Sequence, residues 1–465
     1  MKEAVLEKSP LALEFEQSFP HLPAGDVPWV ERMRKRSFER FAQTGFPDEK
    51  TPGWKFFPAS KIQETPWKLF EFPVSARASD LRNSPLFAQE DCLPLSFLNG
   101  YYLPDLQGPH SEGFVAANLS ALLKNNPERF ENFWGHRPVG GLGAFEALNG
   151  AFFQDGSAIV LPQGFISPKP IHLFFFNRPS NHASMTHPLN LIALGPRSKA
   201  VIVQEYAGED GVCLTNAVTE IFLDEGAQLD LIVIEREGAG AFHLESIAVH
   251  QASHSRFSAS SVFMGESSSR QELEVELEGE NAECAVNGLY RSNGDQSKNI
   301  KTAITHSKPH TRSVELYKGI LDERGKAAFE GLIAVKPEAQ KTDASLYNKN
   351  LILSEEAQVH TSPEFKIEAD DVRCKHGSAI GQMDTNALFY LKSRGFGDKE
   401  AREALLYAFQ SEIISAIPVE GIRLAVLDIL SNCVPYSQSE SVPNHLQEGR
   451  YDSAKSGLEG SSDGL

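Results

Sequence analysis

Between residues 150 and 368 the apolar positions fall into short runs separated by glycine, asparagine, aspartate and proline, such as AIVLPQG, LNLIALG and QLDLIVIEREG. Helical periodicity is almost absent here, whereas strict alternation occurs in QELEVELEGE, residues 271–280. A period of two predicts β-strands with one buried and one solvated face. The side chains of this segment divide accordingly, with Leu273, Val275 and Leu277 facing a core and Glu272, Glu274 and Glu276 facing water.

The turns help to choose among the architectures that are built from many short strands. Sandwiches, propellers and β-helices all place such strands at regular spacing. Few Asn-Gly or Asp-Gly pairs of the tight-hairpin kind occur, and many turns fall on single glycine or asparagine residues, as in DEGAQLD and EGENAECAVNG. The pattern favours a right-handed parallel β-helix over a meander of hairpins, although no exact repeat period is visible.

Helical periodicity is found on both sides of this region. An amphipathic stretch runs from Pro28 to about Gly45, and one or two short helices are expected between residues 116 and 146. After Asp384 the helical pattern returns in TNALFYLKSRG, in residues 398–417 and in EGIRLAVLDILSN. The longest of these segments carries one apolar stripe, formed by Ala401, Leu405, Ala408, Phe409, Ile413 and Ala416.

These patterns predict a mainly β protein whose parallel β-helix core is flanked by N-terminal and C-terminal helical regions. The last residues are rich in serine and glycine, which is typical of disorder. We predict four parts, namely a helical N-terminal region and lead-in at 1–110, the β-helix core at 111–383, a C-terminal helical subdomain at 384–432 and a disordered tail at 433–465.

Charge and composition exclude some function classes. The chain has 62 acidic against 44 basic side chains, a net charge of -18, which argues against general nucleic-acid binding. The N-terminus lacks the pattern of a secretory signal, and no run reaches the length of a membrane span, so we expect a cytoplasmic protein. Five scattered cysteines without a CxxC motif make a disulfide framework or a self-contained zinc site unexpected: Cys92, Cys213, Cys284, Cys374 and Cys433.

Common catalytic motifs are missing. The sequence has no GxxxxGK[ST], so the chain carries no P-loop of its own, and no HExxH or GxSxG occurs. The segment GGLGAFEALNG begins like a dinucleotide fingerprint but has Glu146 where the third glycine belongs and lacks a preceding strand. We interpret this segment as a loop.

The strongest candidate for chemistry is ADDVRCKHGSAIGQMD, residues 369–384. If the first part is extended, Cys374 and His376 share one face with Asp370 and Val372. Imidazolium and nearby cations would favour the thiolate, which binds metals, but tetrahedral coordination needs two further ligands that nothing adjacent supplies. The alternative is a buried cysteine and a backbone-bonded histidine at the corner between a strand and a helix.

Three other groups have simpler structural explanations. In HSKPH, Pro309 prevents the helical geometry that a ligand pair would use. A second histidine pair lies in a strand-like run and is explained as an outward polar row, and an aromatic cluster near residue 55 is explained as local packing. The residues concerned are His306 and His310, His250 and His254, and Trp54, Phe56 and Phe57.

Taken together, these segments resemble the SufB/SufD family of iron-sulfur cluster assembly proteins, and most closely its SufD branch. The segment ADDVRCKHGSAIGQMD, with ALFYLKSRG and AREALLYAF after it, is similar to the C-terminal signature of that family. Upstream, residues 318–372 with AQKTDA resemble the last turns of the family's β-helix, and ALNGAFFQDGSAIVLPQG resembles its opening. GWKFF departs from the Glu-Trp-Lys-Tyr-Thr stretch of the SufD branch at Phe56 and Phe57.

The resemblance implies a non-ATPase scaffold that pairs with SufB and binds the ATPase SufC. Cys374 and His376 would lie near the SufB interface, where iron or a nascent cluster is handled transiently, and SufB would supply the missing ligands. The C-terminal helices would dock SufC, with contacts expected at Tyr407, Phe409, Glu412 and Ile413. No tightly bound cofactor is expected on the isolated chain, and the resemblance leaves room for a flavin on the complex.

Two alternatives stay open at this stage. A purely structural subunit would use the Cys374 and His376 pair only to shape a corner of the fold. A β-helix carbohydrate-active protein would need acidic side chains gathered on successive turns for acid-base chemistry. The sequence offers only alternating rows such as Glu272, Glu274 and Glu276, which solubility also explains.

Overall fold

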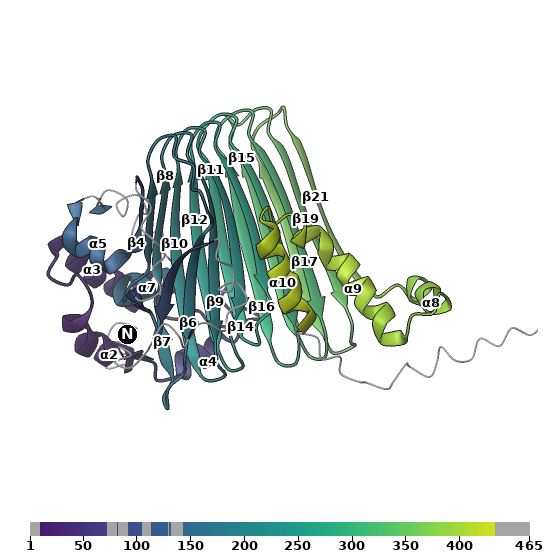
Figure 1. Cartoon of the computed structure of the whole chain (residues 1–465), viewed down its shortest axis with the longest axis horizontal. Coiled ribbons are helices and arrows are strands. Elements are labelled where there is room, and N and C mark those ends of the chain that lie inside the picture. The colour runs from purple at the N-terminus through teal and green to yellow at the C-terminus, as the bar shows by residue number, and fades with distance from the viewer. Residues whose placement is uncertain are drawn as a thin grey trace, which may run out of the picture.

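The computed structural model describes residues 10–71, 81, 92–104, 113–128, 130–131 and 143–432. In these residues it shows a parallel β-solenoid with helices at both ends (Figure 1). From β8 (Leu189–Leu194) onward the chain passes alternately between two sheets, so that each strand up to β19 (Asp343–Ile352) pairs with the strand two positions further along. The predicted mainly β fold with flanking helical regions is confirmed. The predicted disordered tail and Cys433 lie outside the described residues.

One sheet has 11 described strands. Its main path is, in order, β20 (Gln358–Ile367), β18 (Lys326–Val335), β16 (Ser297–His306), β14 (Ser268–Leu277), β12 (Phe242–Gln251), β10 (Cys213–Leu223), β8 (Leu189–Leu194), β5 (Ser157–Leu161) and β4 (Val115–Asn118), with β7 (Ser184–Thr186) and β1 (Lys68–Leu69) attached beside β10. We call this sheet A. Pairing is parallel except between β4 and β5.

The facing sheet, sheet B, has 10 described strands. Their order is β21 (Arg373–Gln382), β19 (Asp343–Ile352), β17 (Arg312–Leu321), β15 (Glu283–Ser292), β13 (Arg256–Phe263), β11 (Gln228–Arg236), β9 (Lys199–Gly208), β6 (Ile171–Asn177), β2 (Leu93–Leu98) and β3 (Tyr101–Tyr102). Only β2 and β3 pair antiparallel here. In both sheets the antiparallel pair therefore lies at the end where the solenoid begins.

Alternating side chains of the two sheets fill the space between them. Leu273, Val275 and Leu277 are buried, as the alternation predicts. Close contact across the interior also depends on glycine. A Cβ atom on Gly288 would lie 1.9 Å from Cε1 of Tyr317, so only glycine leaves room for this buried ring.

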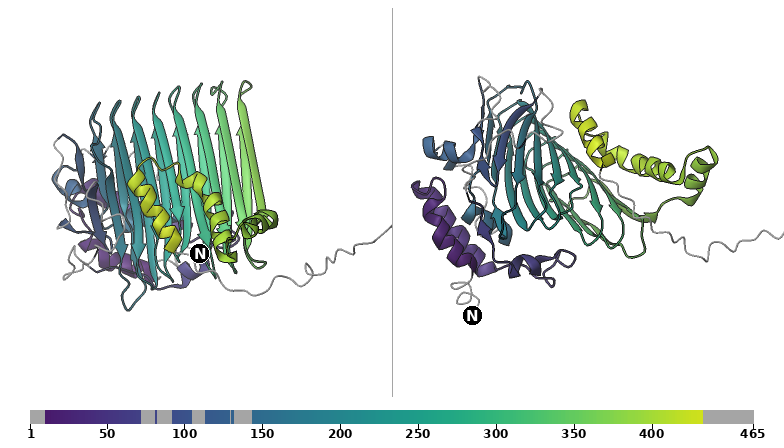
Figure 2. Two further views of the ribbon diagram at one scale, coloured as in Figure 1. Left: turned by 45° about the vertical axis from the view of Figure 1, so that its right-hand side comes forward. Right: turned by 60° about the horizontal axis from the view of Figure 1, so that its bottom comes forward.

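The N-terminal helices cover the outer face of sheet A at the beginning of the solenoid (Figure 2). Arg34 is buried and donates hydrogen bonds to the carbonyl oxygens of Pro23, Ala151 and Phe153, which ties two helices together. The helical elements are α2 (Pro10–Ser18), the 3-10 turn η1 (Phe19–His21), α3 (Pro28–Thr44), α4 (Ala59–Glu64), α5 (Leu119–Asn125) and α7 (Ala144–Phe152).

The prediction of a loop in GGLGAFEALNG is wrong for most of that segment. Residues from Ala144 onward form α7, which is held at its start by a hydrogen bond of 2.6 Å from the Gly143 amide to a carboxylate oxygen of Glu146. The glutamate that breaks the dinucleotide fingerprint is thus a capping residue of a helix. Trp54 stacks on Phe145 of this helix, with ring centroids 5.3 Å apart, which agrees with local packing.

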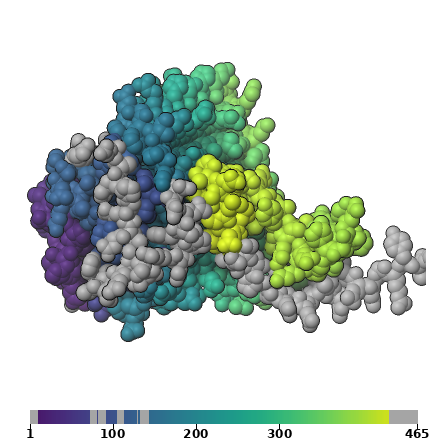
Figure 3. Space-filling view, in the orientation of Figure 1, coloured from purple at the N-terminus to yellow at the C-terminus, as the bar shows by residue number. Residues whose placement is uncertain are grey.

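The C-terminal helices are α8 (Thr385–Ser393), α9 (Asp398–Ile414) and α10 (Glu420–Asn432). Helices α9 and α10 pack on the outer face of sheet B, while α8 projects beyond the last strands (Figure 3). The apolar stripe expected on α9 is partly wrong, because Ala408 is exposed, Leu405 and Ala416 are only partly buried, and the helix ends at Ile414. The buried residues of this segment are Ala401, Leu406, Ile413, Ile414 and Ile417. None of the helices in the described ranges is both long and apolar enough to cross a membrane.

Candidate functional site

The last coil of the solenoid is open. Strand β20 pairs only with β18 and strand β21 only with β19, so within the described part of the chain both last strands have a free edge. Free edges with unpaired backbone groups are normally covered or paired. The inward side chains of these strands also reach solvent, with Ile367 42% and Ile380 51% exposed. This end of the molecule therefore has the features of an interface.

Cys374 and His376 lie on this open end. They are near the start of β21, and the strand continues past Gly377 to Gln382, so the pair lies within a strand and not directly at the corner before α8. Their register partners, Ala344 and Leu346 on β19, are buried core residues. Both side chains therefore share the inward face, as the sequence predicted, and extend the core row to its exposed end.

The two side chains differ in their surroundings. Cys374 is half-buried and packs against the solenoid core beside Val372. His376 is exposed, and its imidazole stacks on Phe365 of β20 with ring centroids 4.7 Å apart and an interplanar angle of 22°. One ligand-type side chain is thus embedded in the end face while the other stands on its surface.

The expected stabilisation of a thiolate is not found in this chain. Burial raises the pKa of Cys374, and the nearby carboxylate of Asp343 raises it further. Arg373 and Lys375 point from the opposite face of the strand, because the side chains alternate. Within the described part of the chain, these surroundings favour the neutral thiol of Cys374 over the thiolate.

Two of the other three described cysteines have different surroundings from Cys374. Cys213 and Cys284 are buried in the solenoid, and burial raises the pKa of both thiols. Among the described residues, Cys374 and His376 do not belong to any group of three metal-ligating side chains. Cys374 and His376 are thus two ligand-type side chains at the open end, and a metal bound there would need further ligands from outside the described residues.

The residues expected to contact an ATPase lie on α9 but do not form one exposed surface. Tyr407 is 53% exposed and Ile413 is fully buried against sheet B, so Ile413 anchors the helix and offers no surface contact. Phe409 is partly buried, and its ring lies 4.8 Å from Lys318 Nζ. Glu412 pairs with Lys318 at 2.7 Å. Two of the four residues thus hold α9 on the solenoid through the same lysine.

The remaining sequence candidates do not assemble into sites with each other. His306 is buried and hydrogen-bonds Thr311 and Ser313, whereas His310 lies exposed in a turn. His254 also lies in a turn, away from the row that contains His250. Two members of the glutamate row are in ion pairs, Glu272 with Arg270 and Lys301, and Glu276 with Lys336.

The sequence reasoning missed a column of polar side chains inside the solenoid. Lys298 and Glu235 are fully buried and form an ion pair of 2.9 Å, with Ser269 at 2.9 Å from the same ammonium group. Neighbouring inward residues continue the column, with Glu237 paired to His243 at 2.9 Å and Glu245 accepting from Gln271 at 2.7 Å. The alternation rule places Gln271 in the same row as Leu273, which was the available signal.

The charges in this column depend on one another. Burial raises the pKa of Glu235, but the charges of Lys298 and His243 and the hydrogen bonds around it bring that pKa below its usual value. Glu315 accepts a hydrogen bond of 2.6 Å from Thr302 and forms no ion pair with another described residue, and burial raises its pKa to about 7. The interior therefore combines compensated charges with one carboxyl group that titrates near neutrality.

Comparison with known proteins gives matches over nearly the whole described chain. Residues 175–409 match the SufBD core domain of the SUF system for FeS cluster assembly, and residues 8–173 match the N-terminal region of SufBD proteins. An iron-sulfur cluster assembly SufBD family protein of Synechocystis is 29% identical over 81% of this chain and 85% of its own length. The iron-sulfur cluster assembly protein SufD of Escherichia coli is 24% identical over 90% of this chain and 96% of its own. A chloroplastic protein of Arabidopsis thaliana, ABCI7, is 26% identical over 89% of this chain and 88% of its own length.

Proposed function

This chain belongs to the SufBD family of iron-sulfur cluster assembly proteins, and from that premise we propose that it is the SufD-like scaffold subunit of a SufBCD-type complex. In this role a SufB-like subunit covers the open end of the solenoid, and a SufC-like ABC ATPase docks on the C-terminal helices. The chain itself is a non-enzymatic assembly subunit, and ATP hydrolysis is assigned to the SufC-like partner.

One observation carries this proposal. The last coil leaves two strand edges unpaired, exposes Ile367 and Ile380, and presents Cys374 and His376 on the same face. A second β-solenoid placed end to end would pair the edges and bury the apolar side chains. It would also bring its own ligands next to these two residues.

Iron, or a nascent cluster, is the cargo in this proposal and not a resident cofactor. Thiolate and imidazole are suitable ligands for iron, and a metal ion lowers the pKa of a coordinating thiol. Cys374 would lose its proton when iron arrives, and His376 would bind through a ring nitrogen. Two ligands from one chain hold iron weakly, which suits a site where the metal is passed on.

The proposed ATPase surface is formed by α8 and by the exposed side of α9. Helix α8 has no buried residues, and Phe389 and Tyr390 are 74% and 56% exposed. Tyr407 on α9 is also exposed and is assigned to the same proposed surface. Glu412 and Phe409 act indirectly here, because they hold α9 in place through Lys318. Cys213, Cys284 and Cys374 form no disulfide bond, which suits the proposed cytoplasmic location.

Native mass spectrometry tests the assembly. The tagged chain is co-expressed anaerobically with SufB-like and SufC-like partners, and the expected particle contains one copy of this chain, one SufB-like subunit and SufC-like subunits. Recovery of the chain only as a monomer or homodimer would overturn the partner assignment. A variant in which Ile367 and Ile380 are both replaced by lysine should stay folded but lose the SufB-like subunit.

A further inference from the structure

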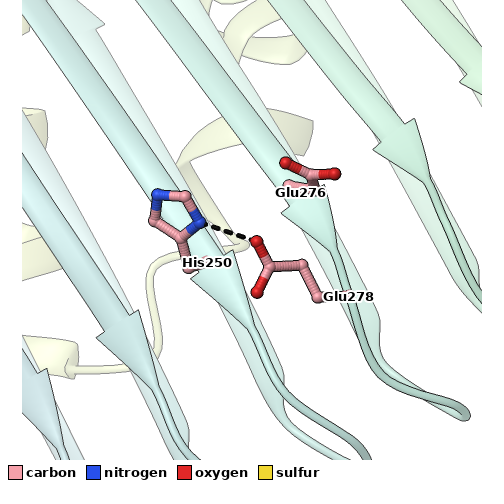
Figure 4. Close-up of side chains that lie close together, drawn as sticks. All are labelled: His250, Glu276 and Glu278. Atoms are coloured by element: carbon pink, nitrogen blue, oxygen red, sulfur yellow. Dashed lines mark hydrogen bonds and ion pairs between the residues drawn. The ribbon is translucent and has the colours of Figure 1, made fainter. Parts of the chain in front are cut away.

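Three ligand-type side chains meet on the outer face of sheet A, away from the open end. His250 near the end of β12 lies opposite Glu276 on β14, and Glu278 follows that strand (Figure 4). The Nδ1 atom of His250 is 2.8 Å from Oε1 of Glu278, and the ligand atoms of all three residues lie within 4.8 Å of one another. In the described residues they form the one group of three metal-ligating side chains that lie this close together.

The distances between these ligand atoms are compatible with one metal ion shared by the three residues. Nitrogen and oxygen ligands at about 2.1 Å from a metal are about 3.0 Å apart when they subtend a right angle and about 3.4 Å apart in a tetrahedron. The 2.8 Å between Nδ1 of His250 and Oε1 of Glu278 is close to the first value. Two ligands on opposite sides of a metal lie about 4.2 Å apart. The ligand atoms of the three residues lie within 4.8 Å of one another, so a side-chain rotation is enough to bring Glu276 to a metal bound by the other two.

The histidine is held in place for this role. Its ring stacks on Phe222 of the neighbouring strand, with centroids 5.2 Å apart and planes 8° from parallel. The side chain is 25% exposed, so the group is supported from below and open to ions from solvent. Glu276 is held at 2.9 Å by Lys336 and at 3.2 Å by Ser307. Phe222 therefore preorganises His250, whereas Lys336 and Ser307 hold the Glu276 carboxylate on other partners.

The charges around the group favour a cation but include one competitor. The negative charges of Glu220, Glu276 and Glu278 favour a positive charge at the position of His250. Lys336 opposes them because its ammonium group occupies one oxygen of Glu276. An imidazole with two carboxylates suits first-row divalent ions such as Fe²⁺, Mn²⁺ and Zn²⁺ better than Ca²⁺ or Mg²⁺, which prefer all-oxygen sites.

We propose that His250, Glu276 and Glu278 form a second, surface site for a divalent transition-metal ion, and that Lys336 weakens this site by competing for Glu276. The site is separate from Cys374 and His376. Those two residues lie on β21 of sheet B, whereas His250 and Glu276 lie on β12 and β14 of sheet A, which β16 and β18 separate from β20, the last strand of that sheet. Binding here needs no partner chain, so it stands or falls independently of the proposed assembly.

Equilibrium titration with Co²⁺ tests the proposal, because its visible absorption reports ligand number and type. The full-length chain carrying Cys374→Ser and His376→Ala serves as the background, so that the open end cannot contribute. We expect one equivalent to bind with a spectrum typical of nitrogen and oxygen ligands. His250→Gln and Glu278→Gln should each weaken the affinity at least about tenfold, as loss of one of three ligands implies.

Two matched variants distinguish a built site from general attraction of cations. His254→Gln removes an exposed histidine four residues away and should leave the affinity unchanged. Lys336→Met should strengthen binding several-fold, because it releases the oxygen of Glu276. No Co²⁺ spectrum, or equal affinities for the background and the His250→Gln and Glu278→Gln variants, would overturn the proposal. Weaker binding after Lys336→Met would overturn the role given to that lysine.

Discussion

The imidazole of His376 on β21 stacks on the ring of Phe365 on β20 with centroids 4.7 Å apart, so this pair connects the two sheets at the open end of the solenoid. The two strands belong to different sheets, and each has one free edge among the described residues. This pair therefore marks the place where the interior of the solenoid becomes an outer surface. It also sets His376 beside the half-buried Cys374, two residues earlier on the same face.

Replacing His376 by alanine should lower the iron and sulfide content of the anaerobically purified complex several-fold while the subunits still assemble. The reason is that the side chain is exposed and contributes a ligand, but little buried area. Metal analysis and native mass spectrometry on the same sample give both readings. His310→Gln, which removes an exposed histidine from a turn, is the matched control. An unchanged iron and sulfide content would favour the purely structural role.

Replacing Lys318 by methionine should loosen α9 from the solenoid. Its ammonium group donates a hydrogen bond of 2.6 Å to the carbonyl of Phe409 and lies 2.7 Å from Glu412. The expected loss in the free energy of α9 packing is about 1–3 kcal/mol, and most of it comes from leaving the Phe409 carbonyl without the nearly buried ammonium group. The exposed carboxylate of Glu412 contributes little. Hydrogen exchange should become faster in residues 398–414. The purified complex should also retain less of the SufC-like partner.

Lys349→Met provides the comparison for Lys318. Lys349 is 3.9 Å from the same carboxylate, and both side chains are about half exposed. The expected change in unfolding free energy is below about 0.5 kcal/mol. Equal effects of the two substitutions would show that charge alone, and not the buried contact with the Phe409 carbonyl, holds the helix.

Replacing Lys298 by methionine should destabilise the solenoid strongly. The substitution leaves the carboxylate of Glu235 buried without its cation, which costs about 3–5 kcal/mol. Adding Glu235→Gln should recover part of this loss, because the buried charge is then removed as well. Urea unfolding of both single variants and the double variant measures the coupling. Strictly additive losses would mean that the two residues do not act as a pair.

The raised pKa of Glu315 predicts that the free energy of unfolding falls as the pH rises. Its pKa in the folded chain is about 7, against 4.5 for an ordinary glutamate, so between these values the folded chain holds a proton that the unfolded chain has lost. Unfolding then releases a proton, and the free energy of unfolding decreases with rising pH, by up to roughly 3 kcal/mol in total. Glu315→Gln should remove this decrease.

Urea unfolding at about pH 5 and about pH 8 tests the prediction for Glu315, because the two conditions lie on either side of its pKa in the folded chain. The variant should gain stability relative to the native chain mainly at the higher pH. Glu274→Gln, at an exposed position of the same solenoid, should leave the pH dependence as it is. A Glu315→Gln variant with the native slope would mean that this carboxyl group is not the one that titrates.

Local patterns were enough to predict the strands, both helical ends and the face shared by Cys374 and His376. These follow from side-chain alternation and helical periodicity, which depend only on neighbouring residues. The interpretation of GGLGAFEALNG failed because a helix start depends on a hydrogen bond from Gly143 to Glu146. The stripe on α9 was misjudged because contact with sheet B, and not periodicity alone, decides which side chains are buried.

The sequence by itself therefore determined the type of the fold, its family and the pair of ligand-type residues at its end. Only the tertiary structure decided which distant residues meet. Glu235 and Lys298 are 63 positions apart, and His250 and Glu278 are 28 apart. Such pairs are set by the length of each coil and the register between strands, and no visible repeat in the sequence encodes either. The exposure of Cys374 and His376 likewise follows from the solenoid ending at β20 and β21, a property of the stacking that no single strand contains.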